Sequence, residues 1–163
     1  MKFRIHTGHH RAHPWIIGLW HNRYVIRKRV IFGYGCNYKL EGEDAEDTNK
    51  LFGIGYLWNH HKESARFGWL YKDGKIQINA YIYRNGVRTI EPLCVVVLGF
   101  VYEFHLIINP GYYTLRVKSS NSMILAEKDY PYDHKKKWSF PLSLYFGGNK
   151  TAPNDMEVEM KNL

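Results

Sequence analysis

The hydrophobic pattern is clearest between Ser64 and Gly86, where two runs rich in β-branched and aromatic residues flank the turn sequence Lys72-Asp73-Gly74-Lys75. The second run alternates between two sets of side chains: Ile76, Ile78, Ala80 and Ile82 in the first, and Gln77, Asn79, Tyr81 and Tyr83 in the second. Successive side chains of a strand point to opposite faces, so this pattern predicts one core face and one face toward water or a ligand. The run ends at Arg84-Asn85-Gly86, a second hairpin turn.

Similar short runs recur along the chain, with turn residues between them. The other expected strands are Trp15–Trp20, Tyr24–Phe32, Leu51–Trp58, Val87–Glu91, Leu93–Ile108, Tyr112–Lys118, Met123–Ala126, Ser139–Phe146 and Met156–Met160. The run Leu93–Ile108 is long enough for one bent strand or for two strands joined at Gly99. No pattern indicates a helix of three turns, and no internal repeat occurs. About nine or ten short strands predict an all-β fold, an antiparallel β-sandwich of jelly-roll type.

Two irregularities interrupt these patterns. Three adjacent cations, Arg27 to Arg29, stand within the run Tyr24–Phe32. Since they cannot all face a core, we expect this strand at a sheet edge or strongly twisted. Glycines 53, 55 and 68 lie within strand patterns, which indicates bulges or close backbone approach rather than helix.

We expect the 163 residues to form one domain, 1–163, large enough to fold without disulfides or a metal. Residues 1–14 are a polar arm rich in His and Arg and are the least core-like part, whereas residues 41–49 form an acidic loop. Cys36 and Cys94 belong to no CxxC or Cys/His metal spacing, so free buried thiols are expected.

The formal net charge is +8, although the segment Glu41–Asp47 holds five of the 15 acidic residues and no basic one. The rest of the chain is therefore more basic than the total suggests. Such a field attracts nucleic acid, anionic glycans or an acidic protein partner, or it serves only as a solvated surface. The charge does not select among these.

The first residues, Met1 to His6, lack the apolar segment of a signal peptide. No stretch of about 18 uncharged apolar residues occurs. We therefore expect no signal peptide, a cytoplasmic location and no membrane partner.

The histidines are the sharpest chemical feature, because five of the nine lie between His6 and His21. His9 and His13 share a face in either a helix or a strand and are candidate metal ligands. There is no HExxH motif and no nearby carboxylate to complete a site, so exposed polar histidines are the alternative. No cofactor is expected.

A second histidine pair, His60-His61, lies near Glu63, Ser64 and Arg66. These residue types suit acid-base or nucleophilic chemistry, but no GxSxG elbow places the serine for attack. Alternatively, Glu63 and Arg66 form an ion pair, and the imidazoles contact a ligand, another subunit or solvent. A phosphodiesterase-type hydrolase that uses one histidine from each cluster is the enzymatic hypothesis.

A basic, aromatic face is the main binding candidate. Tyr81, Tyr83, Arg84 and Arg88 follow one hairpin, and Tyr112, Arg116 and Lys118 follow another. Cations with stacking rings suit nucleic acid. The amides of Gln77 and Asn79 beside the same rings suit a carbohydrate. Packing of tyrosines across strands is the alternative that involves no ligand.

Two segments carry a resemblance: KLFGIGYLWNHHKESARFGW, within residues 50–86, and YFGGNKTAPNDMEVE, within residues 144–159. They resemble a family of small proteins of Bacteroidota and their phages, in which a closing YFGG…APxD segment precedes the last strand of a β-sandwich. The resemblance covers roughly a third of the chain. It implies a source and a sandwich fold, and no site residue is carried over from it.

The combined prediction is a non-catalytic binding or assembly protein, a phage structural or accessory component in the host cytoplasm or the virion. It binds protein subunits or a glycan through the basic aromatic face, and homo-oligomers are possible. The candidate ligand-binding residues are His60, His61, Arg66, Gln77, Asn79, Tyr81, Tyr83, Arg84, Arg88, Tyr112 and Arg116. The alternatives are a nucleotide or nucleic-acid binder that acts against host defence, and the histidine-dependent hydrolase.

Overall fold

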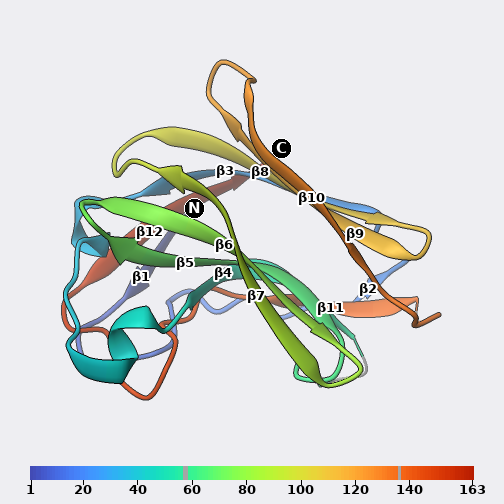
Figure 1. Ribbon diagram of the computed structural model, residues 1–163, viewed down its shortest axis with the longest axis horizontal. Helices are drawn as coiled ribbons and strands as arrows, with labels where there is room; N and C mark the ends of the chain where they lie inside the picture. The colour runs from blue at the N-terminus through green and yellow to red at the C-terminus, as the bar shows by residue number, and fades with distance from the viewer. Residues whose placement is uncertain (57–58, 136) are drawn as a thin grey trace.

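The computed structural model describes residues 1–56, 59–135 and 137–163, and within them the chain forms twelve β-strands and two short 3-10 helices (Figure 1). The strands are β1 Lys2–Ile5, β2 Trp20–His21, β3 Val25–Phe32, β4 Asn49–Tyr56, β5 Ser64–Lys72, β6 Lys75–Arg84, β7 Val87–Val96, β8 Val101–Asn109, β9 Tyr112–Ser119, β10 Ile124–Pro131, β11 Trp138–Leu142 and β12 Met156–Asn162. The helices are η1 Tyr34–Cys36 and η2 Gly42–Glu46. None of the helices in the described ranges is long and apolar enough to cross a membrane.

The strands form two six-stranded antiparallel sheets. Sheet A has the order β1-β12-β3-β8-β9-β10, and sheet B has the order β2-β11-β4-β5-β6-β7. The predicted all-β antiparallel sandwich is confirmed, with twelve strands in the described part rather than nine or ten. The long run at residues 93–108 divides at Gly99, whose φ is +78°.

The alternation predicted for residues 76–83 is confirmed on its core side. Ile76, Ile78, Ala80 and Ile82 are all at most 4% exposed and belong to the core between the sheets. Both predicted hairpin turns also form: Asp73-Gly74 and Asn85-Gly86 have positive φ at both central positions. This is the backbone of a type I′ turn, which suits the twist of the flanking strands.

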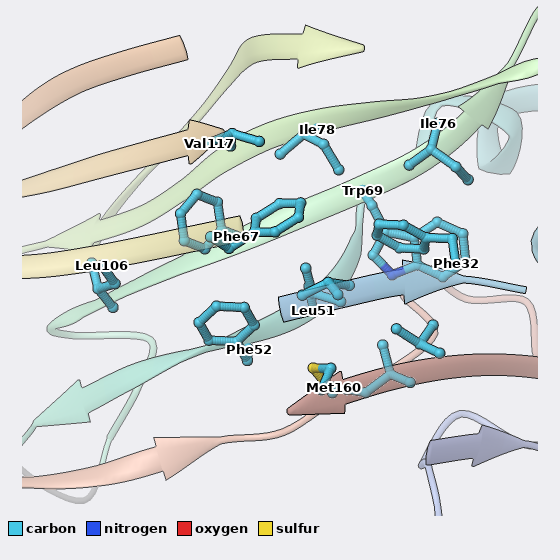
Figure 2. Close-up of a cluster of buried hydrophobic side chains, with 14 of the residues drawn as sticks. Phe32, Leu51, Phe52, Phe67, Trp69, Ile76, Ile78, Leu106, Val117 and Met160 are labelled. Carbon is cyan, nitrogen blue, oxygen red and sulfur yellow. The ribbon is translucent and has the colours of Figure 1, made fainter. Parts of the chain in front are cut away.

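The core is filled by large side chains from both sheets, as Figure 2 shows for ten labelled residues. The rings of Phe67 and Phe104 meet edge to face across the sandwich, with centroids 5.1 Å apart. Trp69 is fully buried beside Phe32, at a centroid distance of 5.4 Å. Such pairs bury much apolar area and fix the spacing of the sheets.

The N-terminal arm is not entirely outside the core. Residues Lys2–Ile5 form β1 at the edge of sheet A, with Phe3 and Ile5 buried. The sequence prediction missed this strand because only two apolar positions stand among cations. Conversely, only Trp20 of the expected strand Trp15–Trp20 lies in a strand, β2. Residues 57 and 58 of the expected strand Leu51–Trp58 lie outside the described residues.

Strand β3 is not an edge strand, so the first of the two alternatives drawn from its three cations, an edge position, is wrong. It pairs with β12 on one side and β8 on the other. Arg27 and Arg29 are exposed on the outer face, while Lys28 is half-buried at the end of the core. Its ammonium donates to Oδ1 of Asn162 at 3.1 Å and lies 5.4 Å from the Phe52 ring centroid, so the inward cation keeps a polar partner.

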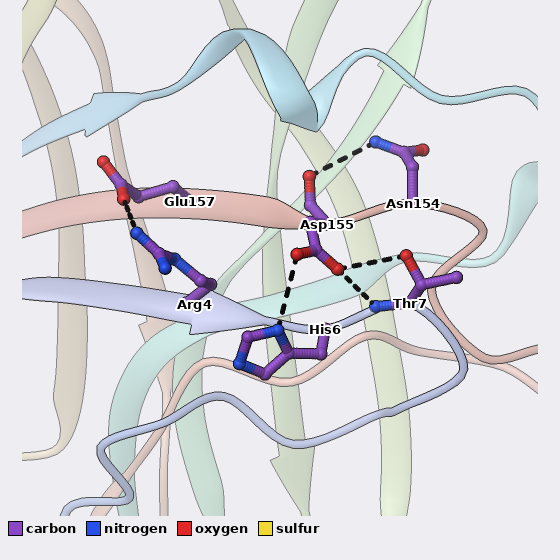
Figure 3. Close-up of polar contacts among 6 residues, drawn as sticks. All are labelled: Arg4, His6, Thr7, Asn154, Asp155 and Glu157. Carbon is purple, nitrogen blue, oxygen red and sulfur yellow. Dashed lines mark hydrogen bonds and ion pairs between the residues drawn. The ribbon is translucent and has the colours of Figure 1, made fainter.

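The closing YFGG…APND segment holds the two ends of the chain together (Figure 3). Oδ1 of Asp155 accepts the backbone N–H of Thr7 at 2.8 Å and the Thr7 hydroxyl at 3.0 Å. Asn154 donates to the carbonyl of Gly35 at 2.6 Å. Earlier in the segment, the N–H of Gly147 donates to Asn49 Oδ1 at 2.8 Å. These contacts assign the segment a structural role.

Candidate functional site

A pocket of about 550 Å³ lies on the face of sheet B that points away from sheet A, here called the outer face. We call it the sheet B pocket. Its lining comes from β4, β5, β6 and β11, from the turn before β5, and from the irregular segment that follows β1. The lining residues are Arg11, Trp15, Ile16, Ile17, Gly18, Lys50, His60, His61, Arg66, Tyr81, Phe140, Pro141, Leu142, Ser143 and Tyr145. Among these described residues there are two arginines and a lysine, and no carboxylate.

Arg66 is the central charged group of the pocket. Its neighbours on β5, Ala65 and Phe67, face the core, so strand alternation turns Arg66 to the outer face. The residue is only 6% exposed, and its guanidinium carbon lies 5.2 Å from the Tyr81 ring centroid. Within the described residues it has no ion pair, and Nε is buried without a hydrogen-bond partner. Burial lowers its pKa to about 10.

Glycines make room for this arginine and for its neighbours. Gly53 pairs with Arg66 across β4 and β5, and a Cβ at residue 53 would lie 2.2 Å from the Arg66 Cβ. A Cβ at Gly55 would lie 2.7 Å from the Phe140 ring, and one at Gly68 would lie 2.4 Å from the Thr48 methyl group. The predicted close backbone approach is therefore confirmed at Gly53 and Gly68, which face the carbonyl oxygens of Ala65 and Asn49, whereas at Gly55 the close neighbour is a side chain.

Lys50 supplies a second cation at the base of the pocket, beside a bulge in β4 between residues 50 and 52. Its ammonium lies 5.1 Å from the Tyr81 ring centroid and 5.9 Å from that of Tyr145. Burial lowers the pKa of Lys50 to about 8; the charge of Arg66 adds to this effect and that of Asp47 opposes it. Lys50 and Arg66 thus lie against the same Tyr81 ring, and two like charges at one ring form a site that favours an anion.

His60 and His61 form the rim toward β6. Their ring centroids are 4.1 Å apart, and the His61 ring meets that of Tyr83 at 5.2 Å. Burial, followed by the charge of Arg66, lowers the pKa of His60 to about 4, so its imidazole is neutral at neutral pH. The histidine adjoining the cations is therefore poised to accept or donate one hydrogen bond without adding charge.

Glu63 and Ser64 are not arranged for the acid-base or nucleophilic chemistry that their residue types suggested. Oε1 of the buried Glu63 accepts the backbone N–H of Asn85 at 2.9 Å, and the predicted ion pair with Arg66 is absent among the described contacts. The Ser64 hydroxyl donates to the carbonyl oxygen of His60 at 2.7 Å rather than to an imidazole. Both residues brace the turn before β5.

The N-terminal segment forms the opposite wall of the pocket. The backbone N–H of Ile16 donates to Ser143 Oγ at 3.1 Å, which ties the segment to the chain after β11. The Arg11 guanidinium lies 5.4 Å from the Trp15 ring centroid. His10 stacks on Tyr145 with centroids 5.2 Å apart, and its Nδ1 lies 2.9 Å from the carbonyl oxygen of Phe146. Part of the predicted N-terminal arm therefore forms a wall of the sheet B pocket.

Six of the predicted binding residues gather at this face. His60, His61, Arg66 and Tyr81 line the pocket, and Tyr83 and Arg88 lie beside it on paired positions of β6 and β7. Arg88 donates a hydrogen bond to the Tyr81 phenol, and this bond raises the pKa of Arg88. Burial raises the pKa of Tyr81, which therefore stays protonated.

The other predicted residues lie elsewhere or serve the fold. Gln77 donates to Asn79 at 2.9 Å, and the buried Asn79 donates to the Thr48 hydroxyl at 3.0 Å, so both amides are engaged within the protein. Arg84 forms a two-pronged contact with Asp133, with both bonds 2.8 Å long. These side chains are held by the protein itself.

Tyr112 and Arg116 lie on β9, in sheet A, where Arg116 pairs with Glu127. The sequence prediction placed them on one surface with Tyr81, but they belong to the opposite sheet. As for metals, no group of three or more His, Cys, Asp or Glu side chains suited to a metal ion is found in the described ranges, and His9 and His13 are exposed.

Sequence reasoning missed Lys50, Tyr145, Arg11 and Trp15. Lys50 and Tyr145 exchange two backbone hydrogen bonds of 2.9 Å, which brings together residues far apart in the chain. No local pattern signals that pairing. Alternation with the buried Leu51 could have indicated that Lys50 points away from the core, but not which residue it meets.

No protein-family model matches the chain, and no curated protein matches its sequence. Solved structures share its fold. Alginate lyase AlyC3 has a TM-score of 0.65 at 12% identity, over 99% of this chain and 74% of its own. The alginate lyase from Klebsiella pneumoniae has a TM-score of 0.65 at 7% identity, over 85% of this chain and 59% of its own.

A third similar structure is the CBM2 module of the evolved Dit of Lactobacillus casei BL23 phage J-1. Its TM-score is 0.53 at 10% identity, over 87% of this chain and 66% of its own. At these identities the likeness shows a shared sandwich architecture alone, and this chain spans only part of each of the three.

Proposed function

We propose that the protein binds an acidic glycan in the sheet B pocket and does so without cleaving it. The observation that carries the proposal is Arg66, a buried guanidinium with an unpaired Nε and no acidic partner among the described residues. An uncompensated buried charge costs several kcal/mol of folding free energy. A carboxylate on a bound ligand would accept from this arginine and offset that cost.

The rest of the lining suits the same ligand. The exposed Trp15 and the half-buried Tyr145 offer flat apolar surfaces on which sugar rings stack. The charged groups of the lining, Arg11, Lys50 and Arg66, only donate hydrogen bonds. A neutral sugar, whose hydroxyls also need acceptors, fits this set less well than a sugar that carries carboxylates.

The fold comparisons support the ligand class. Two of the similar structures are alginate lyases, and alginate is a polymer of uronic acids. We also propose that the sandwich is of the jelly-roll type. The resemblance to proteins of Bacteroidota and their phages, together with the likeness to a module of a phage Dit, supports a phage accessory role.

The described lining argues against cleavage of the ligand by hydrolysis. Hydrolysis of a glycosidic bond generally uses two carboxyl groups, and none lines the pocket. The Ser64 hydroxyl is committed to a backbone carbonyl, so a serine nucleophile is not prepared either.

Isothermal titration with a short polyuronate and with a neutral glucan of equal length tests the proposal. We expect saturable binding of the polyuronate alone, weakened by added salt. Arg66→Gln should weaken this binding by about ten-fold or more, because a charge-assisted bond is lost. Arg116→Gln, in the opposite sheet, is the matched control and should bind as the wild type does.

Equal binding of the neutral glucan would contradict the proposal. Tighter binding of a short single-stranded DNA would favour the nucleic-acid alternative instead. Release of shorter sugar products would contradict the non-catalytic part.

A further inference from the structure

Lys50 combines three features that an ordinary surface lysine lacks. Its side chain is half-buried in the sheet B pocket, its ammonium lies near the rings of Tyr81 and Tyr145, and it forms no ion pair within the described residues. A lysine that is desolvated beside other cations is the usual form of a nucleophilic amine in proteins.

The charged groups that face Lys50 are Arg66, Arg88 and Asp47. Burial and the two arginines hold its pKa at about 8, against the partial opposition of the aspartate. At neutral pH the fraction of neutral amine is therefore larger than in an exposed lysine by roughly two orders of magnitude. Only the neutral amine has the lone pair that attacks a carbonyl carbon.

We propose that Lys50 forms an imine with a small aldehyde or ketone that carries a carboxylate, which Arg66 holds. The Nζ lone pair attacks the carbonyl carbon, and the carbonyl π electrons move to the oxygen. That oxygen then leaves as water with both protons of the neutral amine, while the C–O bond breaks and the C=N bond forms. The step needs no oxidant or reductant.

The proposal shares the pocket of the proposed function but does not depend on glycan binding. Its chemistry follows from two side chains, an amine and an arginine that lie against the same Tyr81 ring. The ligand class is any small carbonyl compound with a neighbouring carboxylate, such as an α-keto acid.

The test is reductive trapping with glyoxylate. The protein is incubated with glyoxylate and cyanoborohydride at neutral pH, and peptide mapping by mass spectrometry locates the secondary amine formed. Mapping separates Lys50 from the α-amino group of Met1. Lys28 is the internal control for burial, since its pKa is also lowered by desolvation, and the exposed Lys72 is the surface control.

We expect Lys50 to be labelled about ten-fold or more faster than Lys28 and Lys72. Glyoxylate should label Lys50 faster than glycolaldehyde, a neutral aldehyde of equal carbon count, whereas Lys72 should show no such preference. Equal labelling of the three lysines would overturn the proposal. So would a Lys50 rate that is the same for both aldehydes, because Arg66 would then play no part.

Two further measurements separate this inference from the proposed function. Lys50→Met should remove the fast label and leave the others. A bound polyuronate should protect Lys50. If no polyuronate binds but the anionic aldehyde still labels Lys50 selectively, the imine proposal stands and the glycan proposal fails. If a polyuronate binds and Lys50 is not selectively labelled, the reverse holds.

Discussion

Gly53 lies directly opposite Arg66 in the β4–β5 pair, so close that a Cβ at residue 53 would stand 2.2 Å from the Arg66 Cβ and 2.3 Å from the Ala65 carbonyl oxygen. Backbone atoms cannot yield to such a contact as the end of a flexible side chain can. The pairing of the two strands therefore sets both the position of the buried guanidinium and the identity of the residue that faces it.

Gly53→Ala should destabilise the fold and disturb the pocket together. The added methyl group must push β4 from β5, at a cost of about 1–3 kcal/mol in the free energy of unfolding. Urea denaturation measures this cost, and titration with a polyuronate measures the loss of binding. Gly18→Ala is the control for stability alone, since its nearest contact would be an ordinary 3.7 Å to Pro141 and the residue itself lines the pocket. An unchanged stability for Gly53→Ala would contradict the close approach.

Arg66→Met should stabilise the protein and abolish polyuronate binding. The substitution removes a buried charge that has no acidic partner among the described residues and keeps an unbranched side chain of similar reach. We expect the free energy of unfolding to rise by about 1–2 kcal/mol. Arg116→Met, whose partner is Glu127 on the other sheet, is the control and should change stability by about 0.5 kcal/mol or less. Loss of stability in Arg66→Met would mean that the guanidinium is satisfied within the fold.

The face of a strand on which a side chain lies could be predicted from the sequence better than the sheet to which that strand belongs. Alternation of Ile76 to Ile82 with Gln77 to Tyr83 settled which side of β6 is core, because it depends only on neighbouring residues. Tyr81 and Arg116 share an equally clear pattern, yet they lie on different sheets. The sheet to which a strand belongs depends on pairings between strands that are distant in sequence. Alternation of residues within one strand carries no information about those pairings.

The same limit explains the pocket. Arg66 and the two histidines of residues 60–61 were predicted because they cluster within one turn and its strand. Lys50 and Tyr145 meet only because the chain after β11 pairs with β4. The two residues are 95 positions apart in the sequence. The three cations of β3 predicted a strand at an edge or strongly twisted; the edge position is wrong, because Lys28 keeps a polar partner at the end of the core.

Asn79→Ala should lower stability and leave polyuronate affinity unchanged. The amide is 2% exposed and links Gln77 to the Thr48 hydroxyl, so its removal leaves buried polar atoms unpaired. We expect a cost of about 1–3 kcal/mol in the free energy of unfolding, measured by urea denaturation. The exposed Asn121, in the β9–β10 turn, provides the control, and Asn121→Ala should cost less. Weakened binding with normal stability would instead favour the predicted ligand role of Asn79.

His60 should make the fold sensitive to mild acid. Burial lowers its pKa to about 4 in the folded state, against an ordinary value of 6.5. Between these two values the unfolded chain binds more protons than the folded one, so stability falls as the pH drops from 6.5 toward 4 and is unaffected by this residue above 6.5. His105, whose pKa burial also lowers, contributes in the same direction.

A comparison of His60→Asn with the wild type isolates the first histidine. The midpoint of urea denaturation is measured near pH 7 and near pH 5 for both proteins. The decrease on acidification should be smaller in His60→Asn than in the wild type, because a group that resists protonation in the folded state has been removed. His9→Asn, at an exposed position of the N-terminal arm, should keep the wild-type response. An identical acid response in all three proteins would place His60 in a solvated setting and remove it from the cationic rim of the pocket.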